Sequence, residues 1–133
     1  MPQHQLAAGL TAKVRLTVGD ADTAQALGSG DVPVLGTPRV VALAEAATVL
    51  ATARALESGD TTVGVRVELD HRAPTPVGHQ VVAEAVLTSV TGRRLVFEVT
   101  VRDEDDDLVV ADGRVERIVV DRGRFVAKAT GGS

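Results

Sequence analysis

The stretch GTPRVVALAEAATVLATARALE, residues 36–57, decides the fold. Thr37 is a predicted helix N-cap, and Pro38 stands at the first helical position, where a missing N–H costs nothing. The stretch therefore predicts a helix from Pro38 to about Glu57. Because this helix is apolar on nearly all sides, we expect other structure to wrap it.

Glu45 is the only charged side chain between Arg39 and Arg54. An unpaired carboxylate buried on such a helix costs on the order of several kcal/mol, so Glu45 needs a partner or a chemical role. One interpretation is a structural carboxylate bonded to the backbone or to an arginine. The other is catalytic, because Thr37 lies about two turns before Glu45 and can share its side of the helix.

His71 follows a predicted strand, Thr61 to Leu69. A lone histidine at a strand end is more often a surface residue than a catalyst. The other two histidines, His4 and His79, lie near the first residues and at a strand start, so only His71 suits a compact site. A hydroxyl, a carboxylate and an imidazole can form a hydrolytic site. We expect Thr37, Glu45 and His71 to converge, within one subunit or across a dimer interface.

The rest of the chain is rich in alternating apolar residues. Period-2 alternation predicts five strands: Lys13 to Val18, Thr61 to Leu69 with its Val and Leu side chains on one face, Gln80 to Val90, Arg93 to Asp103, and Leu108 to Val120. Tight turns make the last three an antiparallel meander. The order strand, helix, four strands predicts one α+β domain over residues 1–133, a curved antiparallel sheet around one long helix. Five strands leave an edge and an incomplete cover, so we expect a homodimer.

The composition excludes several functions. With 44% hydrophobic and 24% charged residues the chain is globular, while a net charge of -4 and 2% aromatic residues argue against nucleic acid binding. Absent cysteine excludes disulfides and thiolate metal sites. The acidic run from Asp103 to Asp107 lacks the Gly and Glu of a calcium loop and indicates a solvated hairpin turn, so we expect no metal. No apolar run is long enough to span a membrane, and we expect a cytoplasmic protein.

Four motifs together resemble a known family. They are Gly36-Thr37-Pro38, Glu45 on the following helix, Val63-Gly64-Val65, and His71-Arg72-Ala73-Pro74-Thr75-Pro76-Val77-Gly78. Their spacing is similar to that of the fluoroacetyl-CoA thioesterase family, and the similarity extends through residues 89–95 and 113–117. The resemblance implies the hot-dog fold, in which a curved sheet wraps a central helix and two subunits pair.

The resemblance also implies site residues. Thr37, Glu45 and His71 match the catalytic threonine, glutamate and histidine of the family. Gly64 matches a glycine beside the acyl group, and Arg117 matches an arginine near the site. No cofactor is implied. The chain differs from the family's fluoroacetate-specific member in the lid segment, residues 31–35, which has no aromatic side chain, and at residue 115, where valine replaces a histidine.

These observations give the hypothesis of an acyl-CoA thioesterase that hydrolyses a short or medium acyl-CoA to a free acid and CoA. Glu45 either orients His71 or attacks the substrate directly. The alternatives are a non-catalytic acyl-CoA binding or sensing module and a hydratase on the same fold.

Overall fold

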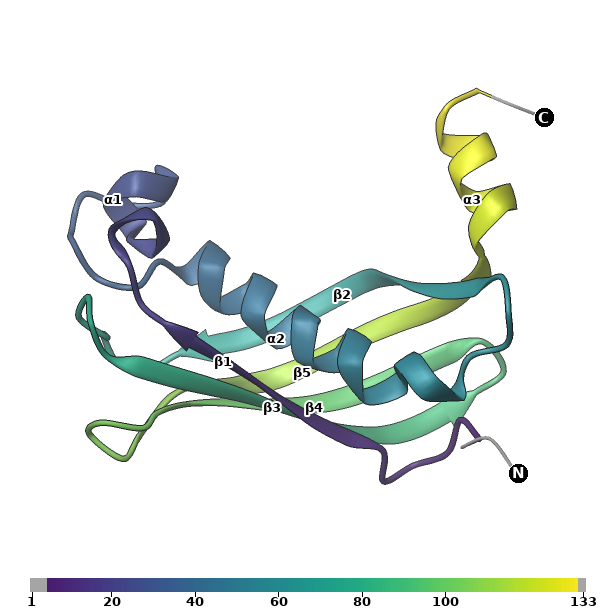
Figure 1. The fold of residues 1–133 in the computed structure, drawn as a ribbon, viewed down its shortest axis with the longest axis horizontal. Coiled ribbons are helices and arrows are strands. Elements are labelled where there is room, and N and C mark those ends of the chain that lie inside the picture. Colours follow the sequence, from purple (N-terminus) through teal and green to yellow (C-terminus); the bar gives the residue numbers. More distant parts are fainter. Residues whose placement is uncertain (1–4, 132–133) are drawn as a thin grey trace.

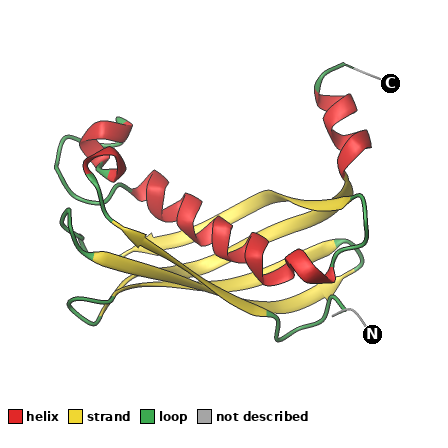
Figure 2. Ribbon diagram, in the orientation of Figure 1, coloured by secondary structure: helices red, strands yellow, loops and turns green. Residues whose placement is uncertain are grey.

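The computed structural model describes residues 5–131. Its sheet is antiparallel, with five strands in the order β1-β3-β4-β5-β2. The strands are β1 (Thr11–Thr17), β2 (Asp60–His71), β3 (Gln80–Thr91), β4 (Arg94–Asp103) and β5 (Leu108–Asp121). The helices are α1 (Ala24–Leu27), α2 (Thr37–Thr52) and α3 (Arg122–Ala129), with 3-10 turns η1 (Asp20–Asp22) and η2 (Ala53–Ala55). Helix α2 lies along one face of the curved sheet (Figures 1 and 2), which confirms the predicted α+β hot-dog architecture.

The core lies between α2 and the inner face of the sheet. Ala44 and Ala47 of α2 are fully buried, and their small side chains let the helix approach the strands closely. The middle strand β4 contributes its alternate residues, Leu95, Phe97, Val99 and Val101, all at most 2% exposed. Burying each such side chain stabilises the fold by roughly 1.5 to 3 kcal/mol, so this face fixes where α2 must lie.

The other face of α2 is not covered by the chain itself. Val49 and Leu50 are 46% and 54% exposed, and Val65 in the edge strand β2 is 51% exposed. The five-stranded sheet of one chain thus covers one side of α2, which is the incomplete cover that the sequence predicts. None of the helices in residues 5–131 is long and apolar enough to cross a membrane.

Two predicted elements differ from the structure near their ends. Helix α2 ends at Thr52 and continues as the 3-10 turn η2, so the helix is shorter than predicted. The strand predicted from Thr61 to Leu69 includes His71 and carries a β-bulge between Gly64 and Arg66. Because a bulge inserts one residue, Val63 and Val65 do not share the face of Val67 and Leu69, and the predicted single apolar face is wrong.

A helix that the sequence reading missed ends the described chain. Asp121 caps α3 by accepting a hydrogen bond from the Arg124 backbone N–H at 2.9 Å. Helix α3 leaves the end of β5 and projects away from the sheet (Figure 1). The last two residues of the chain lie outside the described range.

The acidic hairpin between β4 and β5 is less solvated than predicted. Asp103 is 1% exposed, and its Oδ1 accepts the backbone N–H groups of Asp105 and Asp106 at 2.9 and 3.2 Å. Its Oδ2 lies 2.8 Å from His79 Nδ1. This hydrogen bond raises the pKa of His79 above its ordinary value. Burial works to raise the pKa of Asp103, but the hydrogen bonds from His79 and the turn outweigh it and leave that pKa lowered.

The His79–Asp103 pair should make stability depend on pH. A raised histidine pKa means that the stabilisation is complete below about pH 6.5 and is lost as the pH rises through the raised value. Because the pKa of Asp103 is lowered, the stabilisation from the pair is lost again only in strong acid, where Asp103 becomes protonated. His79→Gln, which keeps a hydrogen-bonding side chain without the charge, should therefore reduce the urea midpoint more at about pH 5.5 than at about pH 9. An equal loss at both values would contradict the assignment.

Candidate active site

Thr37 is the first residue of α2, and its side chain makes no capping hydrogen bond to the helix. Gly36 takes the N-cap position, and no side chain caps this helix end, so the predicted cap role of Thr37 is wrong. Gly36 is needed there because an added Cβ would lie 3.0 Å from the backbone of Ala24 in α1. The hydroxyl of Thr37 is thereby left free for another partner.

That partner is His71, the last residue of β2. Thr37 Oγ1 and His71 Nδ1 are 2.7 Å apart, the length of a good hydrogen bond. The other ring nitrogen, Nε2, is buried without a hydrogen-bond partner among the described residues. Burial lowers the pKa of His71, with the backbone of Ala73 acting in the opposite direction. His71 is therefore favoured in the neutral form, which can accept a proton.

The Thr37–His71 pair opens into a hollow of about 330 Å³. Its walls come from the lid segment before α2 and from the loop after β2, and they are mainly apolar: Val32, Val34, Leu35, Ala73 and Pro74. The first turn of α2 adds the positive end of the helix dipole beside Thr37. A small acyl group with a polarised carbonyl fits such surroundings.

Glu45 forms a second cluster on the same helix. Its Oε2 accepts a hydrogen bond from Arg117 Nη1 at 3.2 Å, and Arg117 is nearly buried, with 7% of its side chain exposed. Arg117 also donates from Nε to the hydroxyl of Thr62 and from Nη2 to its carbonyl, at 2.9 and 3.0 Å. Burial lowers the pKa of Arg117 and Glu45 opposes the shift, yet a guanidinium stays charged.

Gly64 makes room for this cluster. A Cβ built there would collide with Glu45 Oε2 and lie 3.3 Å from Arg117 Nη1. The glycine sits beside the β2 bulge, opposite Arg117 in the neighbouring strand β5. Glu45, Gly64 and Arg117 therefore form one contact unit. The sequence predicts these three as site residues but does not point to Thr62.

The structure joins the predicted residues in two groups and not in one. No hydrogen bond within residues 5–131 connects Glu45 to Thr37 or His71. The single-chain form of the predicted triad is therefore not formed, and convergence across a dimer interface stays a prediction. Thr62, which anchors Arg117, carried no signal in the sequence beyond its place in a strand.

A group of acidic and histidine side chains elsewhere has the spacing of a cation site. His79, Asp103 and Asp105 offer ligand atoms within 4.8 Å of one another. Each already has a partner in the fold: His79 and Asp103 bond to each other, and Asp105 accepts from the Gln80 backbone. The cluster is explained as a structural brace.

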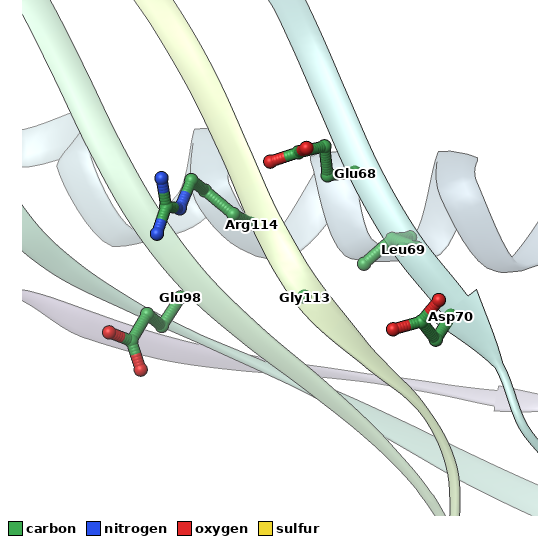
Figure 3. A pocket seen from close by; sticks show the side chains of 6 residues that line it. All are labelled: Glu68, Leu69, Asp70, Glu98, Gly113 and Arg114. Atoms are coloured by element: carbon green, nitrogen blue, oxygen red, sulfur yellow. The ribbon is translucent and has the colours of Figure 1, made fainter.

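A hollow of about 480 Å³ on the outer face of the sheet is also distinct from the Thr37–His71 pair. Figure 3 shows its side chains standing on the strands with α2 behind them. Its charged residues are three carboxylates, Glu68, Asp70 and Glu98, and one arginine, Arg114, and it holds neither a hydroxyl nor an imidazole. It therefore lacks the hydroxyl–imidazole pair that Thr37 and His71 form.

Known proteins resemble this chain in sequence and in fold. The model of the fluoroacetyl-CoA-specific thioesterase family matches residues 18–123. A fluoroacetyl-CoA thioesterase from Streptantibioticus cattleyicolor is 39% identical over 95 residues, which are 71% of this chain and 67% of that protein.

Solved structures of thioesterases are also similar to this chain. The structure of the fluoroacetyl-CoA thioesterase FlK has a TM-score of 0.88 at 29% identity, covering 98% of this chain and 99% of that one. A thioesterase superfamily member from Thermus thermophilus has a TM-score of 0.86 at 25% identity, covering 94% and 91%. With a family match over most of its length, this chain belongs to the fluoroacetyl-CoA-specific thioesterase family.

Proposed function

We propose that this protein hydrolyses short or medium acyl-CoA thioesters to a free acid and CoA. The observation that carries the proposal is the 2.7 Å contact between Thr37 and His71 at the mouth of an apolar hollow. Family membership supports the same chemistry. No metal or cofactor is needed for a reaction of this kind.

In the proposed reaction the acyl group enters the hollow with its carbonyl near the first turn of α2. Neutral His71 accepts a proton from the attacking group and returns it to the thiolate of CoA as the thioester bond breaks. Thr37 orients His71 and hydrogen-bonds to the reacting carbonyl or to the attacking water. The positive end of the α2 dipole stabilises negative charge that develops on the carbonyl oxygen.

Glu45 has two possible roles in this scheme. It can orient the imidazole, or it can attack the carbonyl and form an anhydride that water then hydrolyses. Both roles need a carboxylate held in a fixed direction, and Arg117 and Gly64 provide this constraint. Both also need Glu45 to approach a histidine that it does not contact in its own chain.

A homodimer would meet this requirement. β2 is an edge strand with Val65 exposed near its middle, and α2 has an uncovered face with Val49 and Leu50 exposed. Pairing two copies of β2 antiparallel around a twofold axis places the His71 end of one strand beside the Asp60 end of the other. Glu45 contacts Gly64, which lies toward the Asp60 end, so the partner subunit's His71 would approach it.

The acyl specificity follows from the lid. Residues 31–35 contain no aromatic ring, and Val32 is 48% exposed above the hollow. An apolar pocket separates groups that differ by one substituent by only about 1 to 3 kcal/mol. We therefore propose no strong preference for fluoroacetyl-CoA. A cytoplasmic location stays a prediction from the sequence.

A thiol-release assay against a panel of acyl-CoA thioesters tests the activity. We expect turnover of acetyl-CoA and fluoroacetyl-CoA at rates within about two orders of magnitude. His71→Ala should reduce kcat by about 10²-fold or more, while His79→Gln, outside the hollow, should not. Because burial lowers the pKa of His71, wild-type activity should fall only below about pH 6.5.

Two results would contradict this proposal. A preference for fluoroacetyl-CoA by several orders of magnitude would refute the lid argument. Binding of acyl-CoA without cleavage of any thioester in the panel would instead establish the binding-module alternative.

The dimer has its own test. Light scattering should give a mass near twice the 13.8 kDa of the chain. A structure of the dimer should show an interface that buries more than about 1,000 Å² in total. Val65→Asp places a charge in the proposed interface without touching the core, so it should produce folded monomers and remove activity together. Full activity in a monomer would show that one chain holds a complete site.

Gly64→Ala tests the Glu45 cluster. The added methyl must displace the carboxylate of Glu45, and a displacement of about 1 Å can cost up to 10²-fold in rate. We expect kcat to fall at least about tenfold while the melting temperature changes little. Gly19→Ala is the matched control, since its Cβ would meet the nearest atom at an ordinary 3.5 Å. An unchanged kcat in Gly64→Ala would show that the position of Glu45 is unimportant.

A further inference from the structure

A hollow of about 400 Å³ lies between α3 and the end of β5. We call it the α3 groove; its lining is Arg93, Ile118, Val119, Val120, Asp121, Arg124, Phe125 and Lys128. No step proposed above uses it. Its lining residues come from α3, from the end of β5 and from Arg93 before β4. Helix α3 leaves the sheet at the upper right of Figure 1.

The α3 groove is strongly basic in a chain of net charge -4. Arg93, Arg124 and Lys128 form no ion pair with any residue of the range 5–131. The one carboxylate of the lining, Asp121, is occupied in capping α3. Arg93 is held in place because its Nη1 donates to the Val119 carbonyl at 3.1 Å. Three cations thus face one hollow with little to neutralise them, which favours a ligand with several negative charges.

The α3 groove also offers apolar surface for a flat ring. Phe125 is 43% exposed, whereas the other phenylalanine, Phe97, is fully buried in the core. Ile118 and Val120 supply an aliphatic wall. An exposed aromatic ring beside arginine and lysine suits a nucleotide, whose base stacks while its phosphates meet the cations. A plain inorganic anion would leave this apolar part of the groove unused.

The position of the α3 groove suits one end of a long substrate. Arg117, the partner of Glu45, lies four residues before Asp121 in β5. At the rise of a strand, the two residues are roughly 13 Å apart. Ile118 and Val120 alternate with Arg117 and Val119, so they point to the opposite face of the sheet. His71 of the same chain pairs with Ala111, roughly 33 Å from Asp121 at the strand rise, which is too far for one CoA molecule to span easily. In the proposed dimer, a CoA bound in the groove instead extends its flexible pantetheine arm round the end of the sheet to Glu45 and the partner subunit's His71.

We propose that the α3 groove binds the 3′-phosphorylated ADP end of CoA, with the phosphates on Arg93, Arg124 and Lys128 and the adenine against Phe125. This inference rests on the proposed acyl-CoA substrate. The groove then contributes to binding, remote from the thioester, and leaves the chemical step unchanged.

The test compares two thioesters of the same acyl group, one of CoA and one of pantetheine, which lacks the nucleotide. The variant Arg124→Gln/Lys128→Gln removes two charges and retains helix-forming side chains. We expect its KM for acyl-CoA to rise at least about tenfold with kcat unchanged, and its kinetics with acyl-pantetheine to match wild type. Lys13→Gln/Arg54→Gln makes the same charge change at exposed sites without ion pairs and should leave both KM values unchanged. Phe125→Leu should weaken acyl-CoA binding and not acyl-pantetheine binding.

Calorimetry with 3′,5′-ADP separates this inference from the proposed function. Wild type should bind it and the double variant should bind it at least about tenfold more weakly, even if neither thioester is cleaved. Binding of 3′,5′-ADP without cleavage of either thioester would refute the thioesterase proposal and support the groove assignment. Two kinetic results for the double variant would overturn the groove assignment: an unchanged KM for acyl-CoA, or an equal rise of KM for both thioesters. Dissociation of the double variant into monomers would also overturn it, because the groove would then be an interface between copies of the chain.

Discussion

A buried guanidinium must be paired, and Arg117 obeys this constraint by linking three elements. Taking an arginine out of water costs several kcal/mol unless its donors are satisfied, on the order found for buried ion pairs. Arg117 extends from β5, donates twice to Thr62 of β2 and once to Glu45 of α2. Each of these positions is therefore fixed relative to the others. The missing side chain at Gly64, beside the β2 bulge, follows from the need to leave room for the carboxylate.

The same constraint explains why a charged residue survives in an apolar helix. The structural interpretation of Glu45 is confirmed in its bond to an arginine, and the catalytic interpretation stays a prediction, although one third of the side chain is exposed. A purely structural carboxylate gains nothing from that exposure. A reacting carboxylate needs it, together with a fixed direction. The contacts alone favour a group that is held in place and accessible.

The sequence predicted the fold well where periodicity was strong. The alternation in β4 and the long apolar run of α2 each report a buried face directly, and both elements lie where they were expected. The bulge in β2 was not predictable, since one inserted residue leaves local composition unchanged while reversing which side chains face the core. Helix α3 was not predicted because it is only eight residues long, basic and almost entirely exposed, with no buried stripe.

The site was predictable in its residue types but not in its pairing. Gly36 took the cap position because of its close fit against Ala24, a contact between distant segments that no local rule contains, and this freed Thr37 for His71. Asp103 likewise looked like one more exposed acid in a turn. Its burial depends on His79, which lies 24 residues earlier along the chain.

The bulge in β2 has a further consequence for molecular selectivity. A regular edge strand can add any other regular strand, including one from an unrelated sheet or an unfolded chain. With Val65 inserted, the ladder of free backbone groups changes phase halfway along the edge. A straight foreign strand can match only one half of it, whereas an identical strand running the opposite way can match both halves by symmetry. The bulge that adjoins the Glu45 cluster thus also protects the open edge against mispairing and aggregation.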